Sequence, residues 1–429
     1  MQTSRRTFLA SALAAVGGVM MGHASCLQDS PERSRRKTPD AEIRTDTWQD
    51  IRSHFLLDPN LIHMAGLFLA SHATLVRRSI STYRRSLNKN PARYVMENNS
   101  SLRTQVRQAA ARYMGVKPDE IALTDSTTMG TALVITGLRI RENQEMLTAE
   151  FDYYSTHESM RYQKERSGAS MRVIPLYRDV RTVTEEEVVD ALIGNIRPET
   201  RLVTATWVHS ATGLKVPIRS IAERVIAINA DRSYEDRVIF FVDGVHGLGV
   251  EDTQVGELGC DFFSAGTHKW MFGPRGTGVL WGHPRAQDSV VPTIPTFTPD
   301  AGWGGRISPG GFKAFEHQWA LAEAFTYHEA IGRGRVQERI HSLASQIKEG
   351  LKPMKHVILY TPMAQHLSSG LVCFDVNGMS PPQVIEALLQ QKIVASTTPY
   401  SPSYARLAPG VYNTPEEIET VLEAIRGLA

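Results

Sequence analysis

An unbroken apolar run from Val238 to Val242, closed by Asp243, constrains the fold of this chain more than any other feature. β-Branched and aromatic residues fill the run, which is typical of a strand buried on both faces of a sheet. Strands and helices alternate along the chain, which predicts an α/β fold. Because ligands of open α/β sheets bind at the carboxyl ends of the strands, we expect Asp243 at a binding edge.

A lysine follows the next predicted strand, Cys260 to Ser264. The chain there reads Gly266-Thr267-His268-Lys269, and glycines crowd the residues that follow. A lysine amine can form a Schiff base with an aldehyde cofactor, and a buried carboxylate can keep a pyridine nitrogen protonated. Taken alone, Lys269 would be a salt-bridging lysine and Asp243 a helix-capping aspartate. In this order and at strand ends, the two predict pyridoxal phosphate (PLP) chemistry.

The motif Asp243-x-x-His246, followed by Thr267-His268-Lys269 and a glycine-rich turn, resembles the class V aminotransferase family of fold-type I PLP enzymes. The similarity spans roughly residues 60 to 428. Tyr412-Asn413-Thr414 and Pro309-Gly310-Gly311-Phe312 look most like the isopenicillin N epimerase-like branch. The resemblance implies a large domain with a seven-stranded, mainly parallel sheet, a smaller α+β domain, and a homodimer with the sites at its interface.

The chain divides into four predicted parts. Its 429 residues and 42% hydrophobic content suffice for two domains. We predict a signal peptide over residues 1–26, a polar linker over 27–45, a large PLP-binding domain over 60–300, and a small domain built from 46–59 and 301–429.

The N-terminus predicts export. Ser4-Arg5-Arg6-Thr7-Phe8-Leu9 is a twin-arginine signal, followed by an apolar run to Met21. Such a segment is an export address rather than a transmembrane helix, with an amphipathic helix as the alternative. We expect a periplasmic or exported protein that uses the twin-arginine translocase and has no stable membrane span. Cys26 could be a lipoprotein anchor, but His23 stands where leucine is usual, which favours soluble release.

A helix begins after the predicted strand Glu120 to Leu123, and hydroxyl residues open it. Ser126 or Thr127 could simply cap this helix. A helix N-terminus with free N–H groups and hydroxyls is also suited to binding a phosphate. The segment resembles the phosphate loop of the family, which implies that Thr127 and Thr128 contact the phosphate of PLP.

The resemblance also implies an aromatic ring over the pyridine of PLP. Phe151 occupies this position, where histidine is usual. A phenyl ring can stack but cannot transfer protons, so any proton transfer needs another group. Tyr153, Tyr154 or His157 could supply it, although each could equally be a packing or loop residue.

Four further contacts are implied by the resemblance. His246 and His268 tune the ring oxygen and the phosphate side of PLP, and Ser210 lies near the ring oxygen. Arg406, in the pattern Arg-x-x-Pro-x-x-Tyr-Asn-Thr, grips the carboxylate of the substrate, which its planar fork matches with two hydrogen bonds. The alternative for Arg406 is a surface arginine.

The resemblance implies a reaction that starts from a Schiff base of Lys269 with PLP. An amino acid or amine substrate displaces Lys269, and the freed amine of Lys269 then removes the Cα proton. Racemisation, transamination and β-elimination all begin this way. Desulfurases need a mobile-loop cysteine, and residues 396–404 contain none. We therefore predict an epimerase-like or aminotransferase activity, with a C–S or other β-lyase as the alternative.

Two other classes of protein are less consistent with the sequence. A non-catalytic ligand-binding protein of the same fold would not need both Lys269 and Asp243, and a dinucleotide-binding dehydrogenase would carry Gly-x-Gly-x-x-Gly after its first strand. A net charge of +2 gives no case for nucleic acid. The three cysteines have no metal-site spacing, so we predict no metal.

Overall fold

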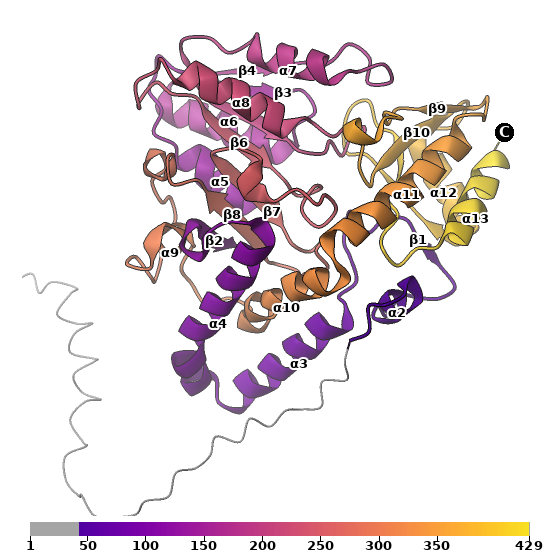
Figure 1. The fold of residues 1–429 in the computed structure, drawn as a ribbon, viewed down its shortest axis with the longest axis horizontal. Helices are drawn as coiled ribbons and strands as arrows, with labels where there is room; N and C mark the ends of the chain where they lie inside the picture. Colours follow the sequence, from indigo (N-terminus) through magenta and orange to yellow (C-terminus); the bar gives the residue numbers. More distant parts are fainter. Residues whose placement is uncertain (1–42, 429) are drawn as a thin grey trace, which may run out of the picture. The chain divides into compact units, whose positions relative to one another are not determined.

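The computed structural model describes residues 43–428 (Figure 1). The predicted signal peptide and the predicted linker up to residue 42 lie outside the described residues. Within residues 43–428, no helix combines the length and the apolar character that crossing a membrane requires.

A seven-stranded sheet forms the centre of the fold, in the order β2-β8-β7-β6-β5-β3-β4. Only β8 runs against its neighbours; every other pair of adjacent strands is parallel. This confirms the predicted seven-stranded, mainly parallel sheet. The strands are β2 (Ile121–Thr124), β3 (Glu145–Ala149), β4 (Ser170–Ile174), β5 (Thr200–Thr206), β6 (Ile239–Asp243), β7 (Phe262–Gly266) and β8 (Gly278–Gly282).

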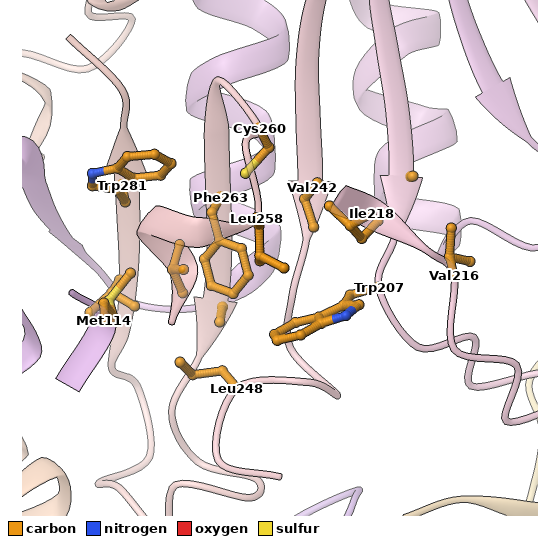
Figure 2. Close-up of a cluster of buried hydrophobic side chains, with 14 of the residues drawn as sticks. Met114, Trp207, Val216, Ile218, Val242, Leu248, Leu258, Cys260, Phe263 and Trp281 are labelled. Carbon is orange, nitrogen blue, oxygen red and sulfur yellow. The ribbon is translucent and has the colours of Figure 1, made fainter. Parts of the chain in front are cut away.

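The central strands are buried on both faces, as the apolar run predicts. Side chains alternate between the faces of a strand, so Phe240 and Val242 of β6 join one core while Phe241 joins the other. On the first face the rings of Phe263 and Trp207 meet edge to face, with their centroids 6.1 Å apart (Figure 2). The parallel pairing of β5 with β6 and of β6 with β7 brings the carboxyl ends of these strands to one edge of the sheet.

Helices cover both faces of the large sheet. They are α4 (Pro91–Met114), α5 (Thr127–Gly137), α6 (Tyr154–Ser167), α7 (Glu185–Ile193), α8 (Ile218–Asn229), α9 (Gly302–Ile307) and α10 (Phe315–Ile331), while α3 (Thr74–Lys89) packs on α10 and α4. Leu133 of α5 packs with Phe241, whereas Ile221 of α8 packs on the opposite face with Phe240. In Figure 1, α10 lies along α3 and α4.

A second, antiparallel sheet has the order β12-β13-β10-β9. Its strands are β9 (Val357–Leu359), β10 (Val372–Val376), β12 (Ser396–Thr397) and β13 (Ala405–Leu407). The helices α11 (Arg333–Leu351), α12 (Pro381–Gln390) and α13 (Pro415–Arg426) share its core with Phe374. A capping box of Thr414 and Glu417 opens α13.

Three short elements complete the path of the chain. The helix α2 (Trp48–Ser53) begins the described fold, and β1 (Ile62–His63) pairs in parallel with β11 (Ile393–Val394). The predicted division at residue 300 stays a prediction. Trp303 of α9 and Phe325 of α10 follow residue 300 but pack in the cores of the large sheet. In the core of the second sheet, the first residue that follows residue 300 is Leu343.

Candidate functional site

A pocket of about 180 Å³ lies where β5, β6 and β7 end. It contains seven of the nine residues that the sequence predicts for the site; Phe151 and Arg406 are the two that do not line it. The lining residues are Phe68, Ser126, Thr127, Thr128, Tyr153, Thr206, Ser210, Asp243, Val245, His246, His268 and Lys269. A cavity lined by one carboxylate, one amine and several hydroxyls therefore lies at the carboxyl edge of the sheet.

Lys269 presents its amine to this pocket from a tight turn after β7. Its Nζ lies 3.2 Å from Nε2 of His246. Burial lowers the pKa of Lys269 to about 8, with Asp243 opposing this shift and Arg406 adding to it. The uncharged amine, which is the form that attacks a carbonyl carbon, is therefore more populated near neutral pH than for an ordinary lysine, at about a tenth of the molecules at pH 7.

The turn that carries Lys269 is held by its own backbone and by packing. The N–H of Phe272 donates to the carbonyl of Lys269 at 3.0 Å, and the N–H of Gly273 donates to Thr267 at 2.8 Å. Phe272 has a φ of 54°, which is unusual for a residue with a side chain. Its ring stacks on His328, with centroids 5.2 Å apart, so tertiary packing maintains the strained turn.

Asp243 is the last residue of β6 and is 2% exposed. Its Oδ1 accepts a hydrogen bond from the N–H of Val245 at 3.1 Å. Burial raises the pKa of Asp243 to about 6, because a desolvated carboxylate is unstable without a cation beside it. Gly244 follows because a Cβ there would lie 1.9 Å from the ring of Phe263. The carboxylate is therefore rigidly placed and would be stabilised by a cationic ligand.

The start of α5 forms the opposite end of the pocket. The hydroxyl of Ser126 accepts a hydrogen bond from the N–H of Met129 at 3.1 Å, so Ser126 caps the helix. Thr127 Oγ1 accepts from the N–H of Gly266 at 2.7 Å, which ties α5 to the end of β7. The N–H groups of Thr127 and Thr128 are the first two of the helix and have no partner within it. An anion can therefore bind here to N–H groups and a hydroxyl.

The geometry favours Tyr153, not Phe151, as the ring over a bound ligand. Phe151 stacks on Tyr177 outside the lining of the pocket, with centroids 6.0 Å apart and planes 7° from parallel. Tyr153 lines the pocket instead, whereas Tyr154 is 60% exposed. The ring of His157 is held by the carbonyl of Ala149, 2.9 Å from its Nε2.

Asp152 fixes the turn that carries Phe151. It is buried, and its carboxylate accepts hydrogen bonds from Thr148, Thr204 and the N–H of Thr206. These bonds fix the turn after β3, with Asp152 against β5 and the ring of Phe151 beside Tyr177 and Tyr400. Sequence analysis missed Thr206, although its position at the end of a buried strand is the same signal that identified Asp243.

Arg406 lies behind Ser210 rather than in the wall of the pocket. Its Nη1 donates to the carbonyl of Ser210 at 2.8 Å, and its Nη2 donates to the carbonyl of Thr397 at 3.2 Å. Its Nε donates to the hydroxyl of Ser396, also at 3.2 Å. The residue is 4% exposed, so it is not a surface arginine. The Ser210 hydroxyl lies 2.9 Å from that of Tyr400. The guanidinium has more N–H donors than these three bonds use, so it can also bind a carboxylate.

The model of the aminotransferase class V family matches residues 70–421. This chain belongs to that family. Aminotransferase class V proteins are PLP-dependent enzymes, and the match extends from the loop before α3 to α13. It includes all nine residues that the sequence predicts for the site.

Relatives in the class V family have several activities. Isopenicillin N epimerase of Streptomyces clavuligerus is 25% identical over 403 residues, which is 89% of this chain and 98% of the relative. Cysteine desulfurase of Klebsiella pneumoniae is 24% identical, over 75% of this chain and 81% of the relative.

Solved structures share the fold. A mutant of C-DES with glycine covalently linked to its PLP cofactor has a TM-score of 0.80 and 22% identity, over 87% of this chain and 98% of that one. CsdA, a cysteine desulfurase from Escherichia coli, has a TM-score of 0.75 and 16% identity, over 88% of this chain and 97% of that one. These likenesses show the fold-type I architecture of the chain.

Proposed function

We propose that this protein binds PLP through Lys269 and acts on an amino acid or amine as an epimerase-like enzyme or an aminotransferase. The observation that carries the proposal is the pairing of a partly uncharged, half-buried amine with a buried carboxylate in one pocket at the ends of neighbouring strands. When bound, PLP supplies an electron sink that weakens the bonds at the Cα of an attached amino acid.

The residues of the pocket fit PLP on the structure's own features. Among the described residues, Lys269 is the cation that acts on the carboxylate of Asp243, and a protonated pyridine would stabilise this carboxylate further. The N–H groups of Thr127 and Thr128 suit the phosphate, while Tyr153 can cover the ring. The Thr206 hydroxyl is buried and has no hydrogen-bond partner among the described residues, so a ligand in the pocket could bind it.

Lys269 is also the residue that can move the proton of the substrate. Once the substrate has bound, the amine of Lys269 is free within the pocket. A base is most efficient when its pKa lies near the working pH, and the pKa of Lys269 is about 8. Ser210 and His246 line the pocket and can donate to the ring oxygen, whereas Arg406 can hold a substrate carboxylate behind Ser210. These roles require no metal ion.

The similarity to isopenicillin N epimerase over nearly its whole length supports an epimerase-like reaction. Cysteine desulfurases are similar over a smaller share, and residues 396–404 contain no cysteine. The test is to incubate the PLP-loaded protein in D₂O with single L- and D-amino acids and with small peptides. We expect deuterium at Cα, with inversion for an epimerase and an oxo acid for an aminotransferase. Release of sulfide or pyruvate would instead show a lyase, and no exchange with any substrate would contradict the proposal.

Arg406→Ala is expected to raise the KM for a carboxylate substrate roughly tenfold to 150-fold, since losing hydrogen bonds to a charged group costs about 1.5–3 kcal/mol. Arg406→Lys should recover only part of this loss, because it keeps the charge without the planar fork. Steady-state kinetics measures both effects, and the absorbance of bound PLP should stay unchanged. Loss of PLP or unfolding would show that the bonds to Ser210, Thr397 and Ser396 are the main role of Arg406.

We also propose export by the twin-arginine route, on the strength of Arg5-Arg6 and the apolar run that follows. Replacing both arginines by lysine should leave the protein folded and unprocessed in the cytoplasm. Fractionation of cells that express the wild type and the variant measures this. Periplasmic wild-type protein in a strain without the translocase would contradict the proposal.

A homodimer is the assembly that we propose. Phe297 and Phe312 support it, because they are 68% and 85% exposed and their rings lie 6.2 Å apart, which leaves an apolar patch for a second copy. Light scattering of the wild type and of a Phe312→Ser variant tests this: the wild type should have twice the mass of the chain, and the variant should dissociate more readily. A monomeric wild type would contradict it.

A further inference from the structure

Trp270, the residue after Lys269, contacts the ring of His246. Both residues are buried. The indole Nε1 of Trp270 lies 3.2 Å from Nδ1 of His246 and donates to it. On the other side of the same ring, Nε2 of His246 lies 3.2 Å from Nζ of Lys269. One imidazole therefore connects an indole N–H to the amine.

The indole determines where the proton of His246 sits. An indole N–H can only donate a hydrogen bond, so Nδ1 of His246 must be the unprotonated nitrogen. Burial holds the pKa of His246 well below its usual value, and Lys269, Arg406 and His268 lower it further. The ring is thus neutral and carries its one proton on Nε2, which faces Lys269. An ammonium at Lys269 would meet this N–H donor to donor, whereas an uncharged amine can accept from it.

We propose that Trp270 is a positioning residue that fixes His246 in the tautomer whose N–H faces Lys269, and so favours the uncharged, nucleophilic form of the amine. The inference deepens the proposed function, because an uncharged amine is what bonding to an aldehyde cofactor requires. Without the indole N–H, the proton of His246 could move to Nδ1. Nε2 could then accept a hydrogen bond from an ammonium, and the charged form of Lys269 would become more stable.

Other charges act on Lys269 as well. Asp243 favours the ammonium and Arg406 disfavours it. His268 is half-buried beside Lys269, and burial lowers the pKa of its ring to about 4, so it is neutral at pH 7. None of these groups depends on the tautomer of His246, so a change at Trp270 should report that tautomer alone.

The test compares Trp270→Phe, which keeps an aromatic ring and removes the N–H, with Trp319→Phe. Trp319 is also buried and donates to Asn99 Oδ1 at 3.2 Å, but it lies in α10 and does not line the pocket. The full-length protein, freed of PLP, is labelled with ¹⁵N-histidine, and the signals of His246 are assigned by their loss in His246→Gln. We expect the proton on Nε2 in the wild type and in Trp319→Phe, and a mixture of tautomers in Trp270→Phe.

The second readout is the pH at which added PLP reacts covalently at half its maximal rate, followed by absorbance. This midpoint should rise by roughly half to one pH unit in Trp270→Phe, as expected for losing one hydrogen bond, and should stay in place in Trp319→Phe. A wild-type His246 that carries its proton on Nδ1 would overturn the inference, whether or not the variant folds. An unchanged tautomer and midpoint in Trp270→Phe would overturn it as well. If PLP never reacts with the wild type, the proposed function fails, while the NMR result still decides the role of Trp270.

Discussion

Lys269→Ala is expected to abolish covalent attachment of PLP and to remove turnover, with the fold unchanged. The amine of Lys269 is the one side-chain amine that lines the pocket formed by the described residues, so nothing there can replace it as a nucleophile. Its loss also removes the base at the substrate, and general base catalysis alone contributes about 10²–10⁴-fold. Taking an amine with a pKa near 8 out of a buried site should cost little stability, since its burial is itself unfavourable.

Borohydride reduction of the PLP-treated protein, followed by peptide mass spectrometry, measures the attachment. The label should lie on the peptide that contains Lys269 in the wild type and be absent from the variant. Lys355→Ala is the control, because Lys355 is exposed and belongs to the segment before β9, far along the chain from the pocket. A wild type labelled at another lysine, or a Lys269→Ala protein that still turns over substrate, would contradict the assignment.

The fold and most of the pocket could be predicted because they depend on local patterns. Continuous apolar runs predict the buried strands, and a polar residue at the end of such a run predicts Asp243. Parallel strands bring their carboxyl ends to one edge, so residues far apart in sequence, such as Thr127 and Lys269, meet there without any knowledge of the contacts.

The position of Phe151 could not be predicted, because it depends on contacts that a local pattern does not contain. The alternation of side chains stops where β3 ends, and the direction of the turn is set by Asp152, which binds Thr204 and Thr206 of the neighbouring strand. The surroundings of Arg406 have the same kind of cause, because the carbonyl of Ser210 that it binds belongs to a loop of the large sheet. In both cases a long-range hydrogen bond decides where a side chain points.

Asp243→Asn is expected to keep the fold and to bind PLP, yet to lose activity by a factor on the order of 10²–10³, as for the removal of one preorganised electrostatic group. Asparagine has nearly the shape of aspartate and can still accept the hydrogen bond from Val245. It carries no charge, however, so it cannot hold the pyridine nitrogen of PLP in its protonated form. The measurement is the exchange of the Cα proton in D₂O, alongside absorbance of the bound cofactor.

The pH dependence of PLP binding provides a second test of Asp243. Burial raises the pKa of this carboxyl to about 6 in the free protein, so the carboxylate is present above that pH and is lost as the pH falls through it. The affinity of the wild type for PLP should therefore weaken below about pH 6. The side-chain amide of asparagine does not titrate, so Asp243→Asn should lack the part of the decline that begins near pH 6 and keep the part that protonation of Lys269 causes.

Asp261→Asn is the matched control, since Asp261 is also buried but pairs with Arg285 away from the pocket. That variant should have a lower thermal stability, because it loses a buried ion pair, and should retain the acidic decline in PLP affinity. If Asp243→Asn instead exchanges the Cα proton at the wild-type rate, the pyridine nitrogen does not depend on Asp243. The buried carboxylate would then serve only to fix the turn at Val245, and Lys269 would carry the chemistry without it.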